Sequence, residues 1–246
     1  VELAIGGDQA ALPWWEINLG EGRTLAFRGS VDRVDVAPAP GREDALCLTV
    51  LDYKSGNKKF EPLKMQAGLQ LQLPAYLAAL SEVAGGSALL DGKQAVPAGM
   101  FYVRLRDATS RAGHRDEEPD VKDGKRFEHT GRFSFERLPL FDSACASGGG
   151  GQFSYRLKKD GEPYANSHQL IRQTELENLL TDAKTLLQAM GRDILAGNIA
   201  VDPYRKGNEL PCTYCDFKSV CRIDPWTHAY RPLRPLLDPA STPAPK

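Results

Sequence analysis

The sequence lacks long hydrophobic runs and any strong excess of charge of one sign. No apolar stretch approaches the length of a membrane span, and the N-terminus has no signal-peptide pattern. The formal net charge is −1, so contact with nucleic acid requires a local patch or a metal rather than overall charge. A G-x-x-x-x-G-K-[ST] motif is also missing, so any ATP-driven motor lies outside these residues. We therefore expect a cytoplasmic protein.

Cysteine is scarce, with 5 residues in the chain. The odd number argues against a closed disulfide framework. Three of the five, Cys212, Cys215 and Cys221, form a C-x2-C-x5-C cluster within the segment 205–225. Thiolates this close together usually bind a metal, and both zinc and an iron–sulfur cluster normally need four ligands. The spacing alone does not choose between the two.

The composition is that of an ordinary globular protein. The chain has 246 residues, of which 41% are hydrophobic and 26% charged, enough for one large core. It begins without an initiating Met, and we expect an excised part of a longer protein. We predict a single domain over 1–230, with a flexible insertion or surface loop over 108–152, where charge and Gly/Ser dominate. The Pro-rich tail, 231–246, is predicted to be disordered.

Hydrophobic periodicity predicts an α/β fold. A β-hairpin, two further strands and two helices are expected, and Pro74 should kink or break the first helix. In that order, the ranges are 14–19 with 24–36, 44–54, 98–107, 64–83 and 175–196. Thr174 with Glu177 forms a capping-box pattern for the last helix, and Gly197 is a plausible stop. Short strands joined by hairpins indicate a mixed sheet rather than a doubly wound parallel one.

The stretch "VLDYKSG", 50–56, ends an apolar strand with opposite charges. Residues i and i+2 of a strand share a face, so Asp52 and Lys54 lie side by side. Upstream, "GSVDRVD" carries Asp32, and if the two strands are neighbours the two carboxylates can converge. Converging carboxylates repel unless a cation lies between them, and Mg²⁺ suits such oxygen ligands. Mg²⁺ would activate a water beside Lys54 for attack on a phosphate.

An isolated D-x-K pattern is more often a surface ion pair that contributes little. The functional interpretation gains weight from order: G-x-x-D comes first, then the strand with D-Y-K, then a Gln-rich helix. Within that helix, Gln72 and Tyr76 form Q-x-x-x-Y; taken alone, they would read as a solvent-facing glutamine and a core tyrosine.

Together, "GSVDRVDV", "VLDYKSG" and "QLQLPAY" resemble the RecB-type branch of the PD-(D/E)XK nucleases, closest to the C-terminal nuclease domain of AddB-type helicase–nuclease subunits. The resemblance implies a restriction-endonuclease-like core and a Mg²⁺- or Mn²⁺-dependent deoxyribonuclease, an exonuclease acting in double-strand break processing and recombination. It implies DNA and an AddA-like helicase subunit as partners. It also implies roles for six residues. Asp32, Asp52 and the Tyr53 carbonyl would bind the metal, Lys54 would be catalytic, and Gln72 and Tyr76 would support the site.

The sequence departs from the family pattern at a histidine. The family usually has a metal-binding histidine in a helix before the first aspartate, whereas the four histidines here all follow Asp32. That helix would precede Val1, so the activity of these residues alone is in question.

The resemblance also bears on the cysteine cluster. AddB-type domains close a [4Fe–4S] cluster with three C-terminal cysteines and a fourth far upstream. Cys47 faces away from Asp52 and reads as a core residue, and Cys145 lies in a Gly/Ser loop. We therefore expect the cluster to be incomplete in this chain, with a role in pinning the C-terminal segment to the core.

Three alternatives remain open from the sequence. A CRISPR-associated exonuclease shares the D…DYK and triple-cysteine pattern. A catalytically idle domain could bind DNA or a partner, although idle relatives tend to lose the metal residues. A zinc-ribbon interaction module would hold zinc at the cysteines and fold normally after Asp52→Ala.

Overall fold

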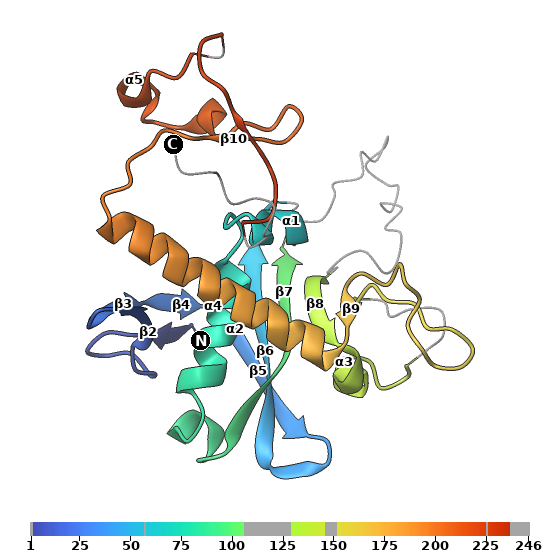
Figure 1. The fold of residues 1–246 in the computed structure, drawn as a ribbon. Coiled ribbons are helices and arrows are strands. Elements are labelled where there is room, and N and C mark those ends of the chain that lie inside the picture. Colours follow the sequence, from blue (N-terminus) through green and yellow to red (C-terminus); the bar gives the residue numbers. More distant parts are fainter. Residues whose placement is uncertain (1, 57, 106–128, 146–151, 225, 237–246) are drawn as a thin grey trace, which may run out of the picture.

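A computed structural model describes residues 2–56, 58–105, 129–145, 152–224 and 226–236. Within these ranges, no helix combines the length and the apolar character needed to cross a membrane. The architecture is a twisted sheet with two helices packed on one face, and a C-terminal segment that projects from the top of the molecule (Figure 1).

The central sheet has five strands in the order β5-β6-β7-β8-β9. Pairing alternates between antiparallel (β5/β6, β7/β8) and parallel (β6/β7, β8/β9), so the predicted mixed sheet is confirmed. The bounds are Arg33–Ala39, Arg42–Lys54, Gln94–Arg104, His129–Ser134 and Leu170–Ile171. β6 and β7 are the longest strands and are buried along most of their length. This rigid pair carries the predicted site at its end.

Helices α2 (Gln72–Val83) and α4 (Gln173–Leu195) cover one face of the sheet (Figure 1). Leu73, Leu77 and Leu80 of α2 are fully buried between the sheet and α4. The helix predicted over 175–196 is confirmed, but its cap lies two residues earlier than the sequence pattern suggested. The Arg172 N–H donates to the Glu175 carboxylate over 2.8 Å, and Gly197 follows with φ +72°.

The helix predicted over 64–83 is interrupted. α1 (Pro62–Gln66) ends at a turn in which Gly68 has φ +75°, and α2 then starts at Gln72. Pro74 lies in the first turn of α2, where its missing N–H has no intrahelical acceptor to lose. The break therefore precedes the proline. It sets Gln72 at the start of a helix.

Two small sheets flank the N-terminal side of the core. The hairpin of β2 (Trp15–Gly20) and β3 (Arg23–Phe27) turns at the predicted "GEG", where all three residues have positive φ. The strand predicted over 24–36 is divided into β3, β4 (Gly29–Val31) and β5, and β4 pairs with β1 (Leu3–Ile5). A short 3-10 helix, Ala88–Leu90, leads into β7.

The prediction of a flexible insertion over 108–152 is wrong for residues 129–145. They form β8, a 3-10 turn (Phe135–Arg137) and the short helix α3 (Leu138–Phe141). Phe133 is fully buried against Phe101, with ring centroids 5.5 Å apart, because an aromatic cluster covers the second face of the sheet. The charge pattern of this region hid its alternating apolar positions. Residues 106–128 and 146–151 lie outside the described residues.

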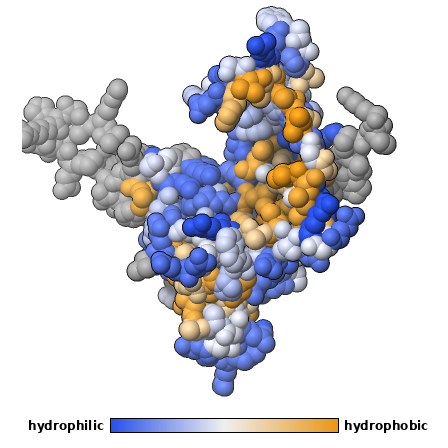
Figure 2. All heavy atoms as spheres, turned by 90° about the vertical axis from the view of Figure 1, so that its left-hand side faces the viewer, coloured by the Kyte–Doolittle hydropathy of each residue, from blue (hydrophilic) through white to orange (hydrophobic). Residues whose placement is uncertain are grey.

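The C-terminal segment returns to α1 after projecting from the core. It contains four short elements: β10 (Tyr204–Arg205), a 3-10 helix (Pro211–Tyr214), α5 (Lys218–Cys221) and β11 (Arg231–Pro232). The Leu236 N–H donates to the Gln66 carbonyl over 2.9 Å, so residues 231–236 of the predicted disordered tail have a defined position. Residues 237–246 lie outside the described part. Apolar side chains gather on the projection in Figure 2. Phe217 and Val220 of this segment are exposed.

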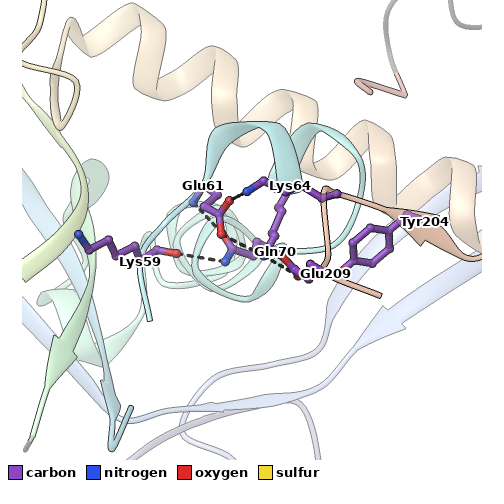
Figure 3. A network of polar contacts seen from close by, with 7 residues as sticks. Lys59, Glu61, Lys64, Gln70, Tyr204 and Glu209 are labelled. Atoms are coloured by element: carbon purple, nitrogen blue, oxygen red, sulfur yellow. Dashed lines mark hydrogen bonds and ion pairs between the residues drawn. The ribbon is translucent and has the colours of Figure 1, made fainter. Parts of the chain in front are cut away.

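A polar network joins this segment to α1 (Figure 3). Lys64 Nζ lies 3.0 Å from Glu61 Oε1 and 2.8 Å from Glu209 Oε1, and the Tyr204 hydroxyl donates to the same Glu209 oxygen. Lys206 also pairs with Glu61. The network therefore links the residues just after β6 to the segment that carries the cysteines.

We predict that acid releases this contact. The Lys64 ammonium holds the pKa of Glu209 below its ordinary value of 4.5, and Lys206 does the same for Glu61. Carboxylates with lowered pKa values stabilise the folded contact above the ordinary value, and this stabilisation is lost as pH falls through the lowered values. The protection factor of the Leu236 amide, which is the free-peptide exchange rate divided by the observed rate at the same pH, should therefore fall below about pH 4.5.

Glu209→Gln should lower this protection factor already at neutral pH and flatten its pH dependence. Asp216→Asn is the matched control, because it also removes one negative charge, from an exposed residue of the same segment. Equal exchange in both variants would contradict the prediction.

Candidate active site

β6 brings the predicted acid–base pair to the face covered by α2. Asp52 is 2% exposed, and its Oδ2 atom lies 2.5 Å from Lys54 Nζ. The two side chains share a face because they are two positions apart in a regular strand. The predicted pair is therefore a largely buried ion pair rather than a surface contact.

Gln72 completes this pair from the first residue of α2. Its amide nitrogen donates to Asp52 Oδ1 over 2.8 Å, and its amide oxygen accepts from Lys54 Nζ over 3.3 Å. The glutamine thus contacts both charged groups and fixes their orientation. A solvent-facing Gln72 is excluded by these contacts.

Asp32 reaches the site from the bend between β4 and β5. Its Oδ2 atom accepts a hydrogen bond from the backbone N–H of Tyr53 over 2.8 Å. Tyr53 directly follows Asp52 in β6. The Asp32 carboxylate is therefore hydrogen-bonded to the residue next to the one that carries the second carboxylate. The structure thus brings Asp32 to the end of β6 occupied by Asp52 and Lys54.

Tyr76 of α2 packs beside Gly29, at the start of β4. Its ring packs edge-on to Phe27, with centroids 6.0 Å apart. A Cβ atom added to Gly29 would lie 2.7 Å from Tyr76 Cε1, which is closer than van der Waals contact allows. The close approach of α2 therefore requires the glycine of "GSVD".

Gly29→Ala is expected to destabilise the fold by about 1–3 kcal/mol, the usual cost of overpacking. It should also reduce any activity of the site, because displacement of Tyr76 moves the helix that carries Gln72. Chemical denaturation measures the first effect. Gly85→Ala is the control, since its added Cβ meets only the Ala95 nitrogen, at 3.9 Å. Equal stability of both variants would contradict the steric explanation.

The donor set at this strand end fits a hard divalent cation. Carboxylate oxygens of Asp32 and Asp52 are such ligands, and the backbone carbonyl of Tyr53 is a further candidate on the same strand. Asp52 Oδ2 is buried against the Lys54 ammonium group at 2.5 Å, so it already has a counter-charge, for which a bound cation would compete. The Tyr102 hydroxyl is buried and has no hydrogen-bond partner among the described residues.

Histidine does not contribute to this set in the described residues. His129 packs against Phe101 in the aromatic cluster, with centroids 5.6 Å apart, and His168 lines a separate surface pocket. No group of three or more His, Cys, Asp or Glu side chains within the described ranges is arranged to hold a metal. Within the described residues, this strand end supplies two carboxylates.

Two residues that the sequence patterns did not indicate also belong to this region. Tyr102 pairs with Asp52 in the parallel register of β6 and β7 and is 1% exposed. Lys54 Nζ lies 5.7 Å and Lys58 Nζ 4.7 Å from the centroid of the Tyr102 ring.

Burial, with the Asp52 charge, raises the pKa of Tyr102. Partial desolvation and the charge of Lys54 lower the pKa of Lys58. In the sequence, the first lysine of "SGNKKF" is the only indication of a second cation in this region.

The cysteines are free thiols. Cys212 and Cys215 are half-buried and Cys221 is exposed, around the short helices of the projecting segment. Cys47 is buried on the face opposite Asp52, as expected for a core residue. Cys145 donates to the Asp142 carbonyl. The described geometry therefore contains no assembled cysteine site, and the ligand roles of the three clustered cysteines stay predictions.

A cavity of about 440 Å³ lies on the other face of the sheet. Cys47, Thr49, Leu51 and Tyr53 of β6 line it, in alternation with the positions that face α2. Arg33 borders it and pairs with Asp35 at 2.6 Å. The cavity is separated from the carboxylates by the strand itself.

Comparison with known proteins agrees with this geometry. The sequence profile of the PD-(D/E)XK nuclease superfamily matches residues 2–222. The B-type subunit of the ATP-dependent helicase/deoxyribonuclease of Symbiobacterium thermophilum is 32% identical over 225 residues, which are 92% of this chain and 19% of the relative. The protein of the same name from Bacillus subtilis is 32% identical over 242 residues, 95% of this chain and 20% of the relative.

The chain thus spans about a fifth of the length of these relatives. The profile match covers nearly all of the described fold, including the end of β6 with Asp52 and Lys54 and the bend that carries Asp32. The chain belongs to the PD-(D/E)XK nuclease superfamily.

Proposed function

We propose that this chain is a Mg²⁺-dependent deoxyribonuclease domain that hydrolyses phosphodiester bonds. The observation that carries the proposal is the joint arrangement of Asp52, Lys54 and Gln72, with Asp32 hydrogen-bonded to the next amide of the strand. An ordinary ion pair needs neither the third hydrogen-bonding partner nor the second carboxylate. Two carboxylates beside an ammonium group at a partly open strand end match the needs of phosphoryl chemistry.

Each residue of the site would have a separate role. Asp32 and Asp52, with the Tyr53 carbonyl, would hold the cation, which supplies charge stabilisation and a more acidic water. Lys54 is fixed by Asp52 and Gln72, so its ammonium is preorganised beside the reacting group and can stabilise charge that develops on phosphate oxygens. Gln72 orients both partners, and Tyr76 holds α2 in place through its contact with Gly29.

The larger biological setting is a further part of the proposal. The relatives are named as subunits of an ATP-dependent helicase/deoxyribonuclease, and they support an AddB-like role in double-strand break processing in the cytoplasm. DNA as substrate, an AddA-like helicase subunit as partner and exonucleolytic cleavage follow from this assignment. The same names favour it over the CRISPR-associated alternative. We also propose that Cys212, Cys215 and Cys221 are ligands of a [4Fe–4S] cluster whose fourth ligand lies outside this chain.

The proposal is tested by DNA cleavage with the complete gene product that contains these 246 residues. Linear duplex and single-stranded DNA are incubated with Mg²⁺ or Mn²⁺, and EDTA is added to matched samples. We expect cleavage with either metal and none with EDTA. Folded protein that binds DNA but shows no metal-dependent cleavage would favour the idle domain instead.

A further inference from the structure

Lys58 places a second cation beside the candidate active site. It forms no ion pair with any described residue, although Lys54 is paired with Asp52 at 2.5 Å. Its ammonium group lies over the buried ring of Tyr102 at 4.7 Å, on the residue that pairs with Asp52 across the strands. The aromatic ring attracts the ammonium group without neutralising it. The positive charge of Lys58 therefore remains available to a ligand.

The backbone holds Lys58 at this place. Its carbonyl accepts a hydrogen bond from the Thr130 hydroxyl of β8 over 3.1 Å, and its N–H donates to the Gly56 carbonyl over 3.0 Å. The neighbouring Lys59 differs, because its carbonyl accepts from Gln70 while its amine points away from the network (Figure 3). The two lysines thus have the same charge and adjacent positions but separate surroundings.

Charge balance indicates what Lys58 binds. Asp32 and Asp52 carry two negative charges, and Lys54 with a divalent cation already exceeds them by one. That surplus matches the single charge of the phosphodiester that is cut. Lys58 adds one more positive charge, which matches a second phosphate of the same strand, since each strand carries a phosphate about every 3.4 Å along the duplex axis.

We propose that Lys58, held over the Tyr102 ring, binds the phosphate next to the one that is cleaved. This inference rests on the proposed nuclease function and adds a substrate-positioning residue to it. A residue that neutralises a flanking phosphate strengthens DNA binding and makes that binding more dependent on salt. It leaves the chemical step nearly unchanged, because it does not touch the bond that breaks.

The test compares Lys58→Met with Lys59→Met in the complete gene product, with linear DNA, Mg²⁺ and a KCl series. Lys58→Met should raise KM about tenfold and leave kcat within about threefold. The slope of log(kcat/KM) against log[KCl] should become shallower by about 0.7–0.9, the contribution of one phosphate contact. Lys59→Met should change neither quantity by more than about twofold.

Further variants separate binding from folding. Lys58→Arg keeps the charge and should retain the wild-type slope, and Lys58→Gln replaces Lys58→Met if that variant unfolds. A slope for Lys58→Met or Lys58→Gln equal to that of Lys59→Met would overturn the inference, even with wild-type cleavage intact. A wild-type protein that cleaves no DNA would instead overturn the proposed function, and a salt slope of DNA binding unaffected by Lys58→Met would then overturn the inference as well.

Discussion

Asp52→Asn is expected to reduce metal-dependent DNA cleavage by at least about a thousandfold. Removing a charged metal ligand costs several kcal/mol of transition-state stabilisation, and each 1.36 kcal/mol is a factor of about ten in rate. Asparagine has the same shape as aspartate, and its oxygen can still accept the hydrogen bond from Gln72, but its NH2 group replaces the oxygen that pairs with Lys54. The variant breaks the same ion pair as Lys54→Met, so its free energy of unfolding should fall by about 1–3 kcal/mol, and cleavage is compared on protein shown to be folded.

Single-turnover cleavage and chemical denaturation, measured on the same protein sample, test this prediction. Asp35→Asn is the matched control. Asp35 also forms an ion pair, with the Arg33 guanidinium, but it borders the cavity on the other face of the sheet. Its activity should stay within about twofold of the wild type. Retention of more than a tenth of the wild-type activity by Asp52→Asn would contradict the assignment of Asp52 as a metal ligand.

Lys54→Met is the second large effect, with an expected loss of cleavage of about 10²- to 10³-fold. Although this variant loses activity, its stability should gain more from added metal than the stability of the wild type does. Lys54 occupies Asp52 Oδ2 at 2.5 Å, so its ammonium group competes with a cation for that oxygen. Without the lysine, the buried carboxylate has lost its counter-charge, and the metal-free protein should be less stable by about 1–3 kcal/mol.

Mg²⁺ should then restore the stability of Lys54→Met by mass action, about 2.7 kcal/mol at a concentration a hundred times the dissociation constant. Thermal unfolding with and without Mg²⁺ measures this gain, which should exceed that of the wild type. Lys93→Met, an exposed lysine far along the chain, controls for the loss of charge. A thermal response equal to that of the wild type would show that Lys54 and the metal do not compete.

The sequence was sufficient to predict the strand end of the site. Asp52 and Lys54 follow from the two-residue period of β6, and the break before α2 was expected near Pro74. The convergence of Asp32 on this strand end required its strand to be a neighbour of β6. β5 does pair with β6, but Asp32 lies in the bend before β5, which no alternation predicts.

Other features needed three-dimensional contacts. Tyr102 looks like any core tyrosine of "AGMFYVRLRD", and only the parallel register places it beside Asp52. β8 was hidden, because its short apolar alternation follows a charged stretch and its partners are distant in sequence. The cap of α4 was misplaced by two residues, since Glu175 and Glu177 both offer a carboxylate at suitable spacing. Local patterns fix a residue's face but not its neighbours across strands.

The alternation along β6 has a consequence for how this strand can vary. Its even positions lead to Asp52 and Lys54, and its odd positions line the cavity behind the sheet. Inserting or deleting a single residue upstream would exchange the two sets, sending the carboxylate into the cavity and a tyrosine to the face covered by α2. Natural length changes should therefore be confined to the turn between β5 and β6, at Pro40 and Gly41, where an added residue leaves the parity of the strand intact.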